Sequence, residues 1–329
     1  MGIEMFGLYN GGEFSFAESL ESFPKNLAET QPSVFFAVPR IWAKFREKIL
    51  EKMPQKKLST LLSIPLLGSV VKKSIKKKLG LSRASHIYSG AAPLSLDLIN
   101  WFETIGIEIF QAYGMTEDCV HSHFNRHGQH KKGSVGLPFK DIKVKISDEG
   151  ELRLFAGGMM KGYYNEPQLT AEAFDEQGYL KTGDKVEIDK NGYLSIVGRV
   201  KDQFKTDKGK YVSPAPIEMK LLANTDIEQV CVVGMGIPQP IMLTVLSATG
   251  KAKPKDELIK SLEKSMNDVN AELESYEKME KVVVMKNDWS IENGLMTPTL
   301  KVKRNEVEKI HVPKYPTWYH TKEATVIWE

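Results

Sequence analysis

Residues 113–117 combine four groups that suit nucleotide chemistry. Tyr113-Gly114-Met115-Thr116-Glu117 follows a strand pattern, and its tyrosine ring could stack on a purine. The Thr116 hydroxyl could donate to a phosphate oxygen, and the Glu117 carboxylate is a hard ligand of the kind Mg²⁺ prefers. Gly114 permits close approach of the backbone. A strand end with an incidental acid is the plainer alternative.

Three further segments fit the same chemistry. Ser89-Gly90-Ala91-Ala92-Pro93 would let a flat ring lie on its backbone, although a tight turn before a helix has the same composition. Asp184, in the segment 179–184, is expected on a glycine turn at a strand end, where it could accept two ribose hydroxyls. Arg199, in the segment 198–205, offers a planar fork of donors to phosphate or ribose oxygens; a charged linker is the alternative.

The elements around these segments indicate two kinds of structure. Residues 13–34 predict a helix, SVFFAV a buried strand and PRIWAKFREKILEKM a second helix. Residues 84–114 then read strand, loop, helix and strand, which favours a parallel α/β arrangement. From residue 131 short alternating runs and turns, such as DEG at 148–150, predict an antiparallel, barrel-like piece.

A smaller α+β unit is expected from about residue 202. Residues 228–236 and 241–249 have the pattern of paired strands, and residues 256–281 form a long amphipathic helical region. A strand follows, and then a loop that leads into a helix at 297–310. A chain of 329 residues is long enough to form two such units.

Composition excludes several classes of protein. A net charge of +3 gives no support for nucleic-acid binding. Cys119 and Cys231 have no metal-ligand spacing and are expected to be small core residues in a reducing cytoplasm. No apolar run reaches the roughly 20 residues that a membrane span needs, and residues 1–12 lack the pattern of a signal peptide.

Five motifs occur in the order and spacing of the adenylate-forming superfamily. These motifs are YGMTE, GGMMKGYYNEPQLTAEAF, YLKTGD, GRVKDQFKT and KGKYVSPAPIE. The chain resembles that family from about residue 32 onward. The family includes acyl-CoA synthetases, peptide-synthetase adenylation domains and firefly luciferase. VPRIWAKF and MTPTLKVKR resemble its long-chain fatty acyl-CoA branch.

The resemblance implies a fold and a domain division. It implies α/β and α+β structure, as in the C-terminal part of an adenylate-forming enzyme. Residues 1–200 would belong to the large AMP-binding domain, with an α/β part over 1–130 and a β-barrel-like part over 131–200. Residues 201–329 would form the small, mobile C-terminal domain.

The resemblance also implies roles for single residues. The implied nucleotide-binding set is Gly90, Ala91 and Ala92 along the adenine, Tyr113 stacked on it, Gly114 and Met115 in the same segment, Thr116 at the phosphate, Asp184 at the ribose and Arg199 bracing the nucleotide. Glu117 would hold Mg²⁺ and counts, with Thr116, among the catalytic residues.

Three lysines have implied roles in the two half-reactions. Lys301 would enter the site that forms the adenylate, and Lys205 would face the site that forms the thioester. Lys201 stands at the hinge between the two domains. Leu300 occupies the position where the family usually has glycine, and Lys303 makes the register of Lys301 uncertain by two residues.

The implied function is ATP-dependent ligation of a long-chain fatty acid to CoA through an acyl adenylate, with fatty acid, ATP and CoA as the small-molecule substrates. The enzyme is expected in the cytoplasm or peripheral to the inner membrane face. The family's phosphate loop should stand before residue 32, and this sequence has no such stretch. We therefore expect a truncated chain, or one completed by an N-terminal half, with little or no ligase activity alone. The alternatives are a non-catalytic remnant that binds nucleotide, acyl-CoA or a partner protein, one half of a split ligase, and an amino-acid adenylating domain.

Two weaker features leave alternatives open. His121, His123, His127 and His130 could support Zn²⁺ but are expected to lie in a surface loop. The lysine-rich region 44–83 is expected to be a solvated helical face, with contact to an anionic membrane surface as the alternative.

Overall fold

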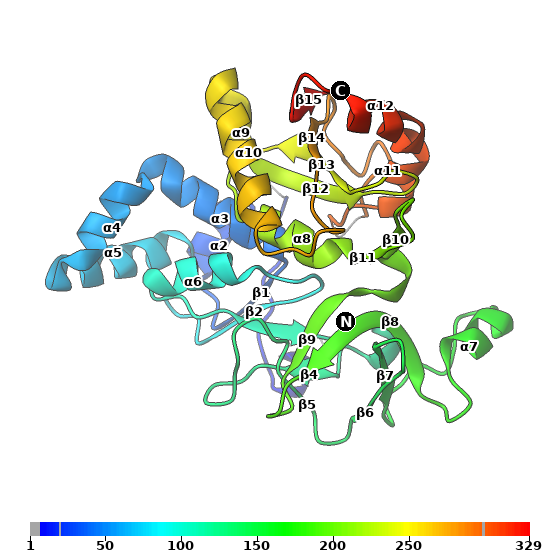
Figure 1. Ribbon diagram of the computed structural model, residues 1–329. Helices are drawn as coiled ribbons and strands as arrows, with labels where there is room; N and C mark the ends of the chain where they lie inside the picture. Colours follow the sequence, from blue (N-terminus) through cyan, green and yellow to red (C-terminus); the bar gives the residue numbers. More distant parts are fainter. Residues whose placement is uncertain (1–6, 20, 298–299) are drawn as a thin grey trace. The chain divides into compact units, whose positions relative to one another are not determined.

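The computed structural model describes residues 7–19, 21–297 and 300–329. Its contacts divide the chain into two compact units (Figure 1). The first unit comprises residues 1–182 and 186–196, and the second comprises residues 183–185 and 197–329.

The first unit contains a five-stranded sheet in the order β1-β2-β3-β4-β5. The strands are β1 (Val34–Ala37), β2 (His86–Ser89), β3 (Phe110–Tyr113), β4 (His123–Phe124) and β5 (Leu137–Pro138). The strands β1, β2 and β3 run parallel, whereas β4 and β5 add antiparallel pairs. The parallel α/β arrangement expected from the sequence is therefore confirmed.

Helices cover this sheet and supply its core. Trp42 and Phe102 are fully buried and their rings meet edge to face at 5.1 Å. The helices are α2 (Phe23–Thr30), α3 (Pro39–Lys52), α4 (Gln55–Ser63), α5 (Pro65–Lys78) and α6 (Leu96–Thr104).

One expectation about these helices is wrong, and another is incomplete. The helix expected over 13–34 is too long, because Pro24 fits the first turn of a helix but not its interior, and α2 begins at Phe23. The lysine-rich region 44–83 was expected to be helical, and α4 and α5 confirm this, but its division into a pair of helices was not predicted. Pro54 precedes α4 and Pro65 begins α5, so these prolines mark that division.

Four strands follow in the order β6-β7-β8-β9. The strands are β6 (Lys143–Ile146), β7 (Glu151–Phe155), β8 (Leu180–Ile188) and β9 (Leu194–Arg199). The first two form the predicted hairpin around the DEG turn, with Ile146 opposite Leu152. The strands that were expected to form a barrel-like piece thus form an open sheet. The helix α7 (Pro167–Ala173) lies between β7 and β8 in the chain.

The second unit is built on a mixed sheet in the order β12-β13-β14-β15. The strands are β12 (Ile227–Val233), β13 (Ile241–Leu246), β14 (Lys281–Val284) and β15 (Val326–Trp328). The predicted pair β12–β13 is antiparallel, and β14 and β15 continue in parallel. β15 was not predicted because it is only three residues long.

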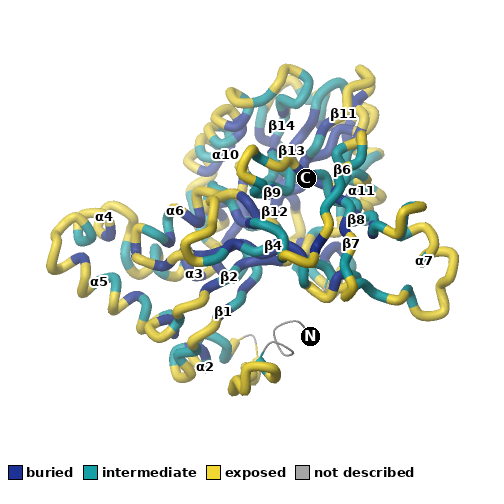
Figure 2. Tube along the Cα trace, turned by 90° about the horizontal axis from the view of Figure 1, so that it is seen from below, coloured by how far each residue is buried: buried dark blue, intermediate teal, exposed yellow. Residues whose placement is uncertain are grey.

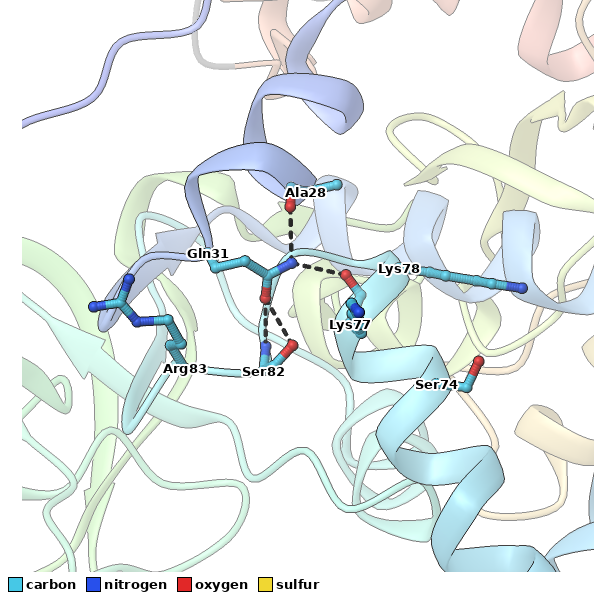
Figure 3. Close-up of a pocket in the computed structure, with 7 residues that line it drawn as sticks. All are labelled: Ala28, Gln31, Ser74, Lys77, Lys78, Ser82 and Arg83. Atoms are coloured by element: carbon cyan, nitrogen blue, oxygen red, sulfur yellow. Dashed lines mark hydrogen bonds between the residues drawn. The ribbon is translucent and has the colours of Figure 1, made fainter.

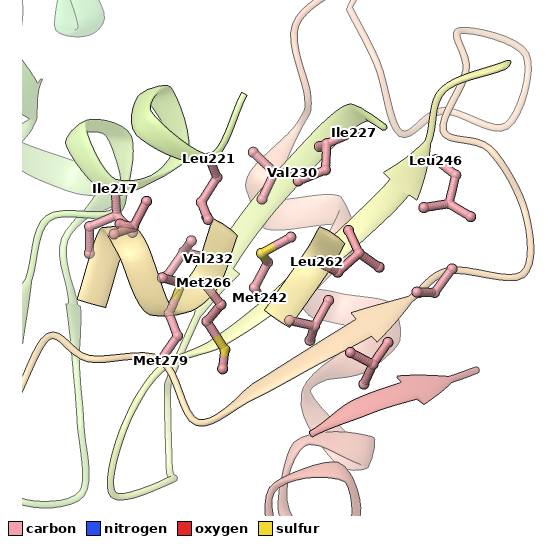
Figure 4. Close-up of a cluster of buried hydrophobic side chains, with 14 of the residues drawn as sticks. Ile217, Leu221, Ile227, Val230, Val232, Met242, Leu246, Leu262, Met266 and Met279 are labelled. Carbon is pink, nitrogen blue, oxygen red and sulfur yellow. The ribbon is translucent and has the colours of Figure 1, made fainter. Parts of the chain in front are cut away.

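Helices complete both faces of the second unit. Side chains from α8 (Pro214–Leu221) and α10 (Lys255–Asn270) pack on one face of the sheet, with Leu221, Met242 and Leu262 fully buried (Figure 4). The remaining elements of the unit are η2 (Val200–Asp202), β10 (Phe204–Lys205), β11 (Tyr211–Val212), α9 (Ala248–Ala252), α11 (Arg304–His311), η3 (Val312–Lys314) and α12 (Tyr315–His320).

The two cysteines differ in environment. Cys231 is buried in β12 as expected, but Cys119 is exposed, so its assignment to the core is wrong. Cys119 lies in a loop with φ of +56°, where the backbone turns its side chain outward. Among the helices that the structure describes, none has the length and apolar character needed to cross a bilayer.

A largely buried ion pair joins α11 to α8 and β12. Arg304 pairs with Glu218, and their side chains are 13% and 16% exposed. Arg304 also donates to the Val232 carbonyl at 2.7 Å, and Glu218 accepts from the Val232 N–H at 2.7 Å. The pair therefore ties the C-terminal helices to the sheet. Because the carboxylate of Glu218 and other acids act on it, the pKa of Arg304 is raised despite its burial.

Removing one member of this pair should destabilise the chain strongly. Arg304→Met leaves the Glu218 carboxylate buried without its cation, and we expect a loss of about 3 kcal/mol in the free energy of unfolding, measured in urea. Lys264→Met, which breaks the exposed pair with Asp268, is the matched control and should cost less than about 1 kcal/mol. Equal losses in the two variants would contradict this account.

Candidate functional site

Two predicted nucleotide segments leave the sheet of the first unit at the same edge. β2 and β3 are parallel neighbours, with Tyr88 opposite Phe110 and Ser89 opposite Gln111. Residues 89–93 follow the end of β2, and residues 113–117 follow the end of β3. Because parallel strands present their carboxyl ends together, these segments lie side by side at the edge where α/β proteins bind ligands.

The first of these segments is small for a packing reason as well. A Cβ added at Gly90 would come within 2.8 Å of the Phe36 ring and 3.0 Å of the Ala112 carbonyl oxygen. Ala91 follows with φ of +66° and is exposed, and Ala92 is half-buried. Glycine at position 90 is therefore required by the sheet itself, and the backbone beyond it turns outward.

The second segment folds back tightly on itself. A Cβ at Gly114 would lie 2.7 Å from the Cα atom of Val120, so only glycine fits there. The buried Asp118 carboxylate accepts the Met115 N–H at 2.8 Å, and burial raises its pKa. Val120 has φ of +59°, which is strained for a β-branched residue. Such strain is common in loops that hold a functional geometry.

Glu117 is fixed by a tyrosine far along the chain. The Tyr163 hydroxyl donates to its carboxylate at 2.9 Å, and the Met160 N–H donates to its backbone carbonyl at 2.8 Å. Burial, then the hydrogen bond to Glu117 and then the charge of Glu117 raise the pKa of Tyr163. Tyr163 was not predicted as a site residue. Its place in the motif GGMMKGYY was the available signal, but no spacing rule connects it to Glu117.

Thr116 and Tyr113 flank this anchored carboxylate. Thr116 is exposed at the start of a short 3₁₀ turn, η1 (Thr116–Asp118). Tyr113 is half-buried at the end of β3, opposite His123 of β4, with ring centroids 6.3 Å apart. Tyr113, which was expected to stack on the adenine, and Thr116, which was expected at the phosphate, therefore share one segment of the first unit.

The remaining predicted residues belong to the second unit. Arg199 Nε donates to Asp184 Oδ1 at 3.1 Å, and the Asp184 side chain is only 13% exposed. Asp184 was expected on a glycine turn at a strand end. Gly183 does have φ of +72°, but it lies within β8, so the expected turn is an irregularity inside a strand.

Lys301 shares its electrostatic environment with this ion pair. Desolvation lowers the pKa of Lys301, the Arg199 charge lowers it further, and the Asp184 charge opposes both. The Lys301 N–H donates to the Thr297 hydroxyl at 3.1 Å. Pro298 and Thr299, which belong to the same predicted motif, lie outside the described residues.

The backbone before Lys301 and the places of Lys205 and Lys201 bear on the roles expected for these lysines. Leu300 has φ of +62°, which explains why glycine suits the position before the lysine. Lys205 lies on β10, with its Nζ atom 5.7 Å from the centre of the Tyr211 ring. Lys201 is in η2, immediately after β9.

The histidine cluster is not uniformly on the surface. His123 is 1% exposed on β4, and desolvation lowers its pKa to about 4, so the expected surface position is wrong for this residue. His121 pairs with Asp141 at 3.0 Å, and His130 lies 3.2 Å from Glu108. Within the described part of the chain, no group of three or more histidine, cysteine or acidic residues could hold a metal ion.

Family models match both parts of the chain. The AMP-binding enzyme model matches residues 1–164, and the model of the AMP-binding enzyme C-terminal domain matches residues 201–322. The chain belongs to the AMP-binding, adenylate-forming enzyme family.

The sequences of individual curated proteins are also similar to this chain. The chain is 29% identical to long-chain-fatty-acid–CoA ligase 5 of Rattus norvegicus, over 95% of this chain and 53% of that protein. It is 31% identical to long-chain-fatty-acid–CoA ligase FadD15 of Mycobacterium bovis, over 67% of this chain and 39% of that protein. The chain thus spans about half the length, or less, of these curated relatives.

Solved adenylation domains share the fold. The adenylation domain of a carboxylate reductase from Mycobacterium chelonae superposes with a TM-score of 0.73 and 23% identity, over 92% of this chain and 49% of that one. The corresponding domain from Segniliparus rugosus, solved with AMP and a carboxylic acid, gives a TM-score of 0.71 over 93% of this chain and 50% of that one. At 23% identity these matches establish the fold alone.

The environment of Lys301 can be tested by titration. Arg199→Met removes a repelling cation and should raise the Lys301 pKa, whereas Asp184→Asn removes an attracting anion and should lower it. Reductive ¹³C-methylation and NMR titration would report the shifts, with Lys303 as an internal control. A Lys301 signal that titrates identically in all three proteins would show that the ion pair is distant.

Acid should destabilise the chain through His123. Its pKa in the folded chain is about 4 and its ordinary value is 6.5, so the unfolded chain binds a proton more readily between those values. Stability should therefore be full above pH 6.5 and fall by about 3 kcal/mol as the pH approaches 4. Urea unfolding from pH 7.5 to 4.5 measures this fall.

His123→Gln should flatten that pH dependence, because the side chain no longer titrates. His121→Gln, at an exposed position, should keep it. If the slope survives in His123→Gln, another group is responsible for the acid sensitivity.

Proposed function

We propose that this chain supplies the adenosine-binding and catalytic residues of an ATP-dependent long-chain fatty acid–CoA ligase. The observation that carries the proposal is the arrangement of two loops at the carboxyl ends of β2 and β3, one of which contains Tyr113 and an anchored Glu117. The names of the relatives support the thioester-forming class and the long acyl chain.

Adenosine recognition requires a flat surface and acceptors for hydroxyls. Tyr113 offers its ring, and the backbone beyond Gly90 offers a face without bulky side chains. Asp184 offers a mostly buried carboxylate to the ribose diol, and Arg199 holds that carboxylate in place. We infer that these groups bind the nucleotide together.

The first half-reaction joins two anions. A carboxylate oxygen of the fatty acid attacks the α-phosphorus of ATP, the bond to the β-phosphate oxygen breaks, and pyrophosphate leaves. A cation at the point of attack offsets the repulsion and stabilises the charge of the transition state. We assign this role to Lys301, which lies within the electrostatic reach of Asp184 and Arg199.

A Mg²⁺ ion bound to the phosphates would neutralise their charge. Such an ion needs only one or two protein carboxylates, because phosphates and water complete its octahedron. Glu117 fits this requirement, since its half-buried carboxylate is oriented by the Tyr163 hydroxyl. Thr116, one residue earlier and exposed, is assigned to a phosphate oxygen.

The second half-reaction forms the thioester. The CoA thiol gives up its proton to water, the resulting thiolate sulfur attacks the acyl carbon, the bond from that carbon to the AMP phosphate oxygen breaks, and AMP leaves with the negative charge. We assign Lys205 to this step and Lys201 to a hinge that lets residues 201–329 alternate between two poses relative to the large domain. The family supplies these two assignments.

Equilibrium binding tests the proposal. By isothermal titration calorimetry, the chain should bind oleoyl-sulfamoyl-adenosine, a stable mimic of the acyl adenylate, more tightly than leucyl-sulfamoyl-adenosine. Asp184→Asn should weaken binding about tenfold or more, because a charge-assisted hydrogen bond to the ribose is lost. Asp148→Asn, at an exposed position, is the control and should bind like the parent.

Tighter binding of the leucyl mimic would favour an amino-acid adenylating domain, and no binding of either mimic would reject the adenosine site. Binding without catalysis is the second candidate function. Pyrophosphate release from ATP and oleate that Lys301→Met abolishes would reject this second candidate, and it would also contradict the expectation that the chain alone has little or no ligase activity.

A further inference from the structure

The helical pair α4–α5 has an anchored base and an uncovered tip. Leu58 of α4 and Ile75 of α5 are 0% and 9% exposed and belong to the core of the first unit. At the tip, by contrast, Leu66 is 87% exposed and Val70 is 62% exposed. Figures 1 and 2 both show the pair projecting from its unit, with mostly exposed residues at the far end.

Hydrogen bonds hold the base rigidly. The Gln31 amide donates to the carbonyls of Ala28 and Lys77, both at 2.8 Å, and accepts from the Ser82 N–H at 3.0 Å and the Ser82 hydroxyl at 2.7 Å (Figure 3). The Trp101 indole N–H donates to the Gln55 side chain at 2.8 Å. The end of α5 and the start of α4 are therefore both fastened.

The tip is held together by close packing of the two helices. A Cβ added at Gly68 would lie 2.7 Å from the Leu62 carbonyl oxygen, so α5 crosses α4 in direct contact there. With Gly68 buried between the helices, the larger side chains of this turn point outward. Ile64 and Leu67, which are 46% and 40% exposed, join Leu66 and Val70 in one apolar patch.

The stem below this patch is strongly cationic. Residues 52–78 contain eight lysines and no aspartate or glutamate. The whole chain has a net charge of only +3, so the remainder is net acidic. At the base, Lys77, Lys78 and Arg83 line an open hollow of about 600 Å³ (Figure 3).

Helical spacing aligns the patch with the charges. Leu66, Val70, Lys73 and Lys77 follow one another at intervals of four, three and four residues, so they share one face of α5, and all four are exposed. Lys73 lies about 10 Å along the axis from Leu66. An interfacial helix buries its apolar part roughly 5–10 Å deep, which would bring Lys73 to the level of the lipid phosphates, with Lys77 about one turn farther from the bilayer.

We propose that the α4–α5 tip docks on a bilayer that contains anionic phospholipid. The apolar patch of Ile64, Leu66, Leu67 and Val70 enters the interface, and the lysines that follow it bind the headgroup phosphates. An aliphatic patch followed by lysines fits such a bilayer, because apolar side chains can enter the interface and lysines can pair with the phosphates. A single-stranded nucleic acid would instead stack its bases on aromatic side chains, and residues 52–82 contain none.

Vesicle co-sedimentation of the full chain tests the proposal without any need for catalysis. Vesicles of phosphatidylcholine and phosphatidylglycerol at 3:1 should bind the chain in low salt, and pure phosphatidylcholine vesicles should bind it at least tenfold more weakly. Lys73→Glu with Lys77→Glu should lower the partition coefficient at least tenfold. Leu66→Ser with Val70→Ser should do the same without changing the charge.

Matched variants control for general effects of charge and polarity. Lys190→Glu with Lys260→Glu makes the same charge change at exposed lysines elsewhere. Leu169→Ser with Ile310→Ser removes two aliphatic side chains that are 48% and 52% exposed. Both controls should bind vesicles within twofold of the parent, and all variants should unfold at the parent's temperature.

Insertion of the tip has its own signature. The fluorescence of Leu66→Trp should shift to the blue on anionic vesicles, whereas that of Ile310→Trp should not. The proposal is overturned if the lysine or tip variants bind like their controls, or if the chain binds both kinds of vesicle equally. Self-association without lipid that the tip variants abolish, together with no vesicle binding, would assign the patch to a second copy and overturn it as well.

Discussion

Parallel pairing of β2 with β3 fixes where the two loops proposed to bind the nucleotide lie in the first unit. Each strand is only four residues long, and each ends in a segment that leaves the sheet at the same edge. The chain is tightly packed where it leaves each strand, since neither Gly90 nor Gly114 has room for a Cβ atom. The strand register therefore determines which residues can reach one ligand.

Charge imposes the second constraint, because the proposed reaction brings one anion against another. The acidic and basic groups are accordingly held by neighbours rather than left to move. Tyr163 holds Glu117, and Arg199 holds Asp184. Partial desolvation lowers the pKa of Lys301, and its charge is balanced between that arginine and that aspartate. Preorganisation of this kind is what electrostatic catalysis requires.

The sequence predicted the strands well where they alternate or follow one another in short α/β units. β1, β2, β3 and the hairpins β6–β7 and β12–β13 were expected, because their β-branched and aromatic runs are bounded by turn residues. The helical character of residues 44–83 was expected, but not their division at Pro65 into α4 and α5. β15 was missed because it is only three residues long and is ordered by pairing with β14. Tertiary pairing of this sort has no local signal.

The sequence identified the motifs of the candidate site, but not the contacts between residues of different motifs. Tyr163 could not be linked to Glu117, since 46 residues separate them and the contact exists only in the fold. Gly183 was expected in a turn and instead bends a strand. Leu300 has the left-handed backbone that glycine usually supplies, which the sequence could mark only as a departure from the family.

The most direct test of the central claim is a crystal structure of the chain bound to a stable acyl-adenylate mimic. The account predicts electron density for the adenine against the Tyr113 ring and for the ribose hydroxyls within hydrogen-bonding distance of Asp184. Density for the nucleotide at a place that contacts neither side chain would contradict it.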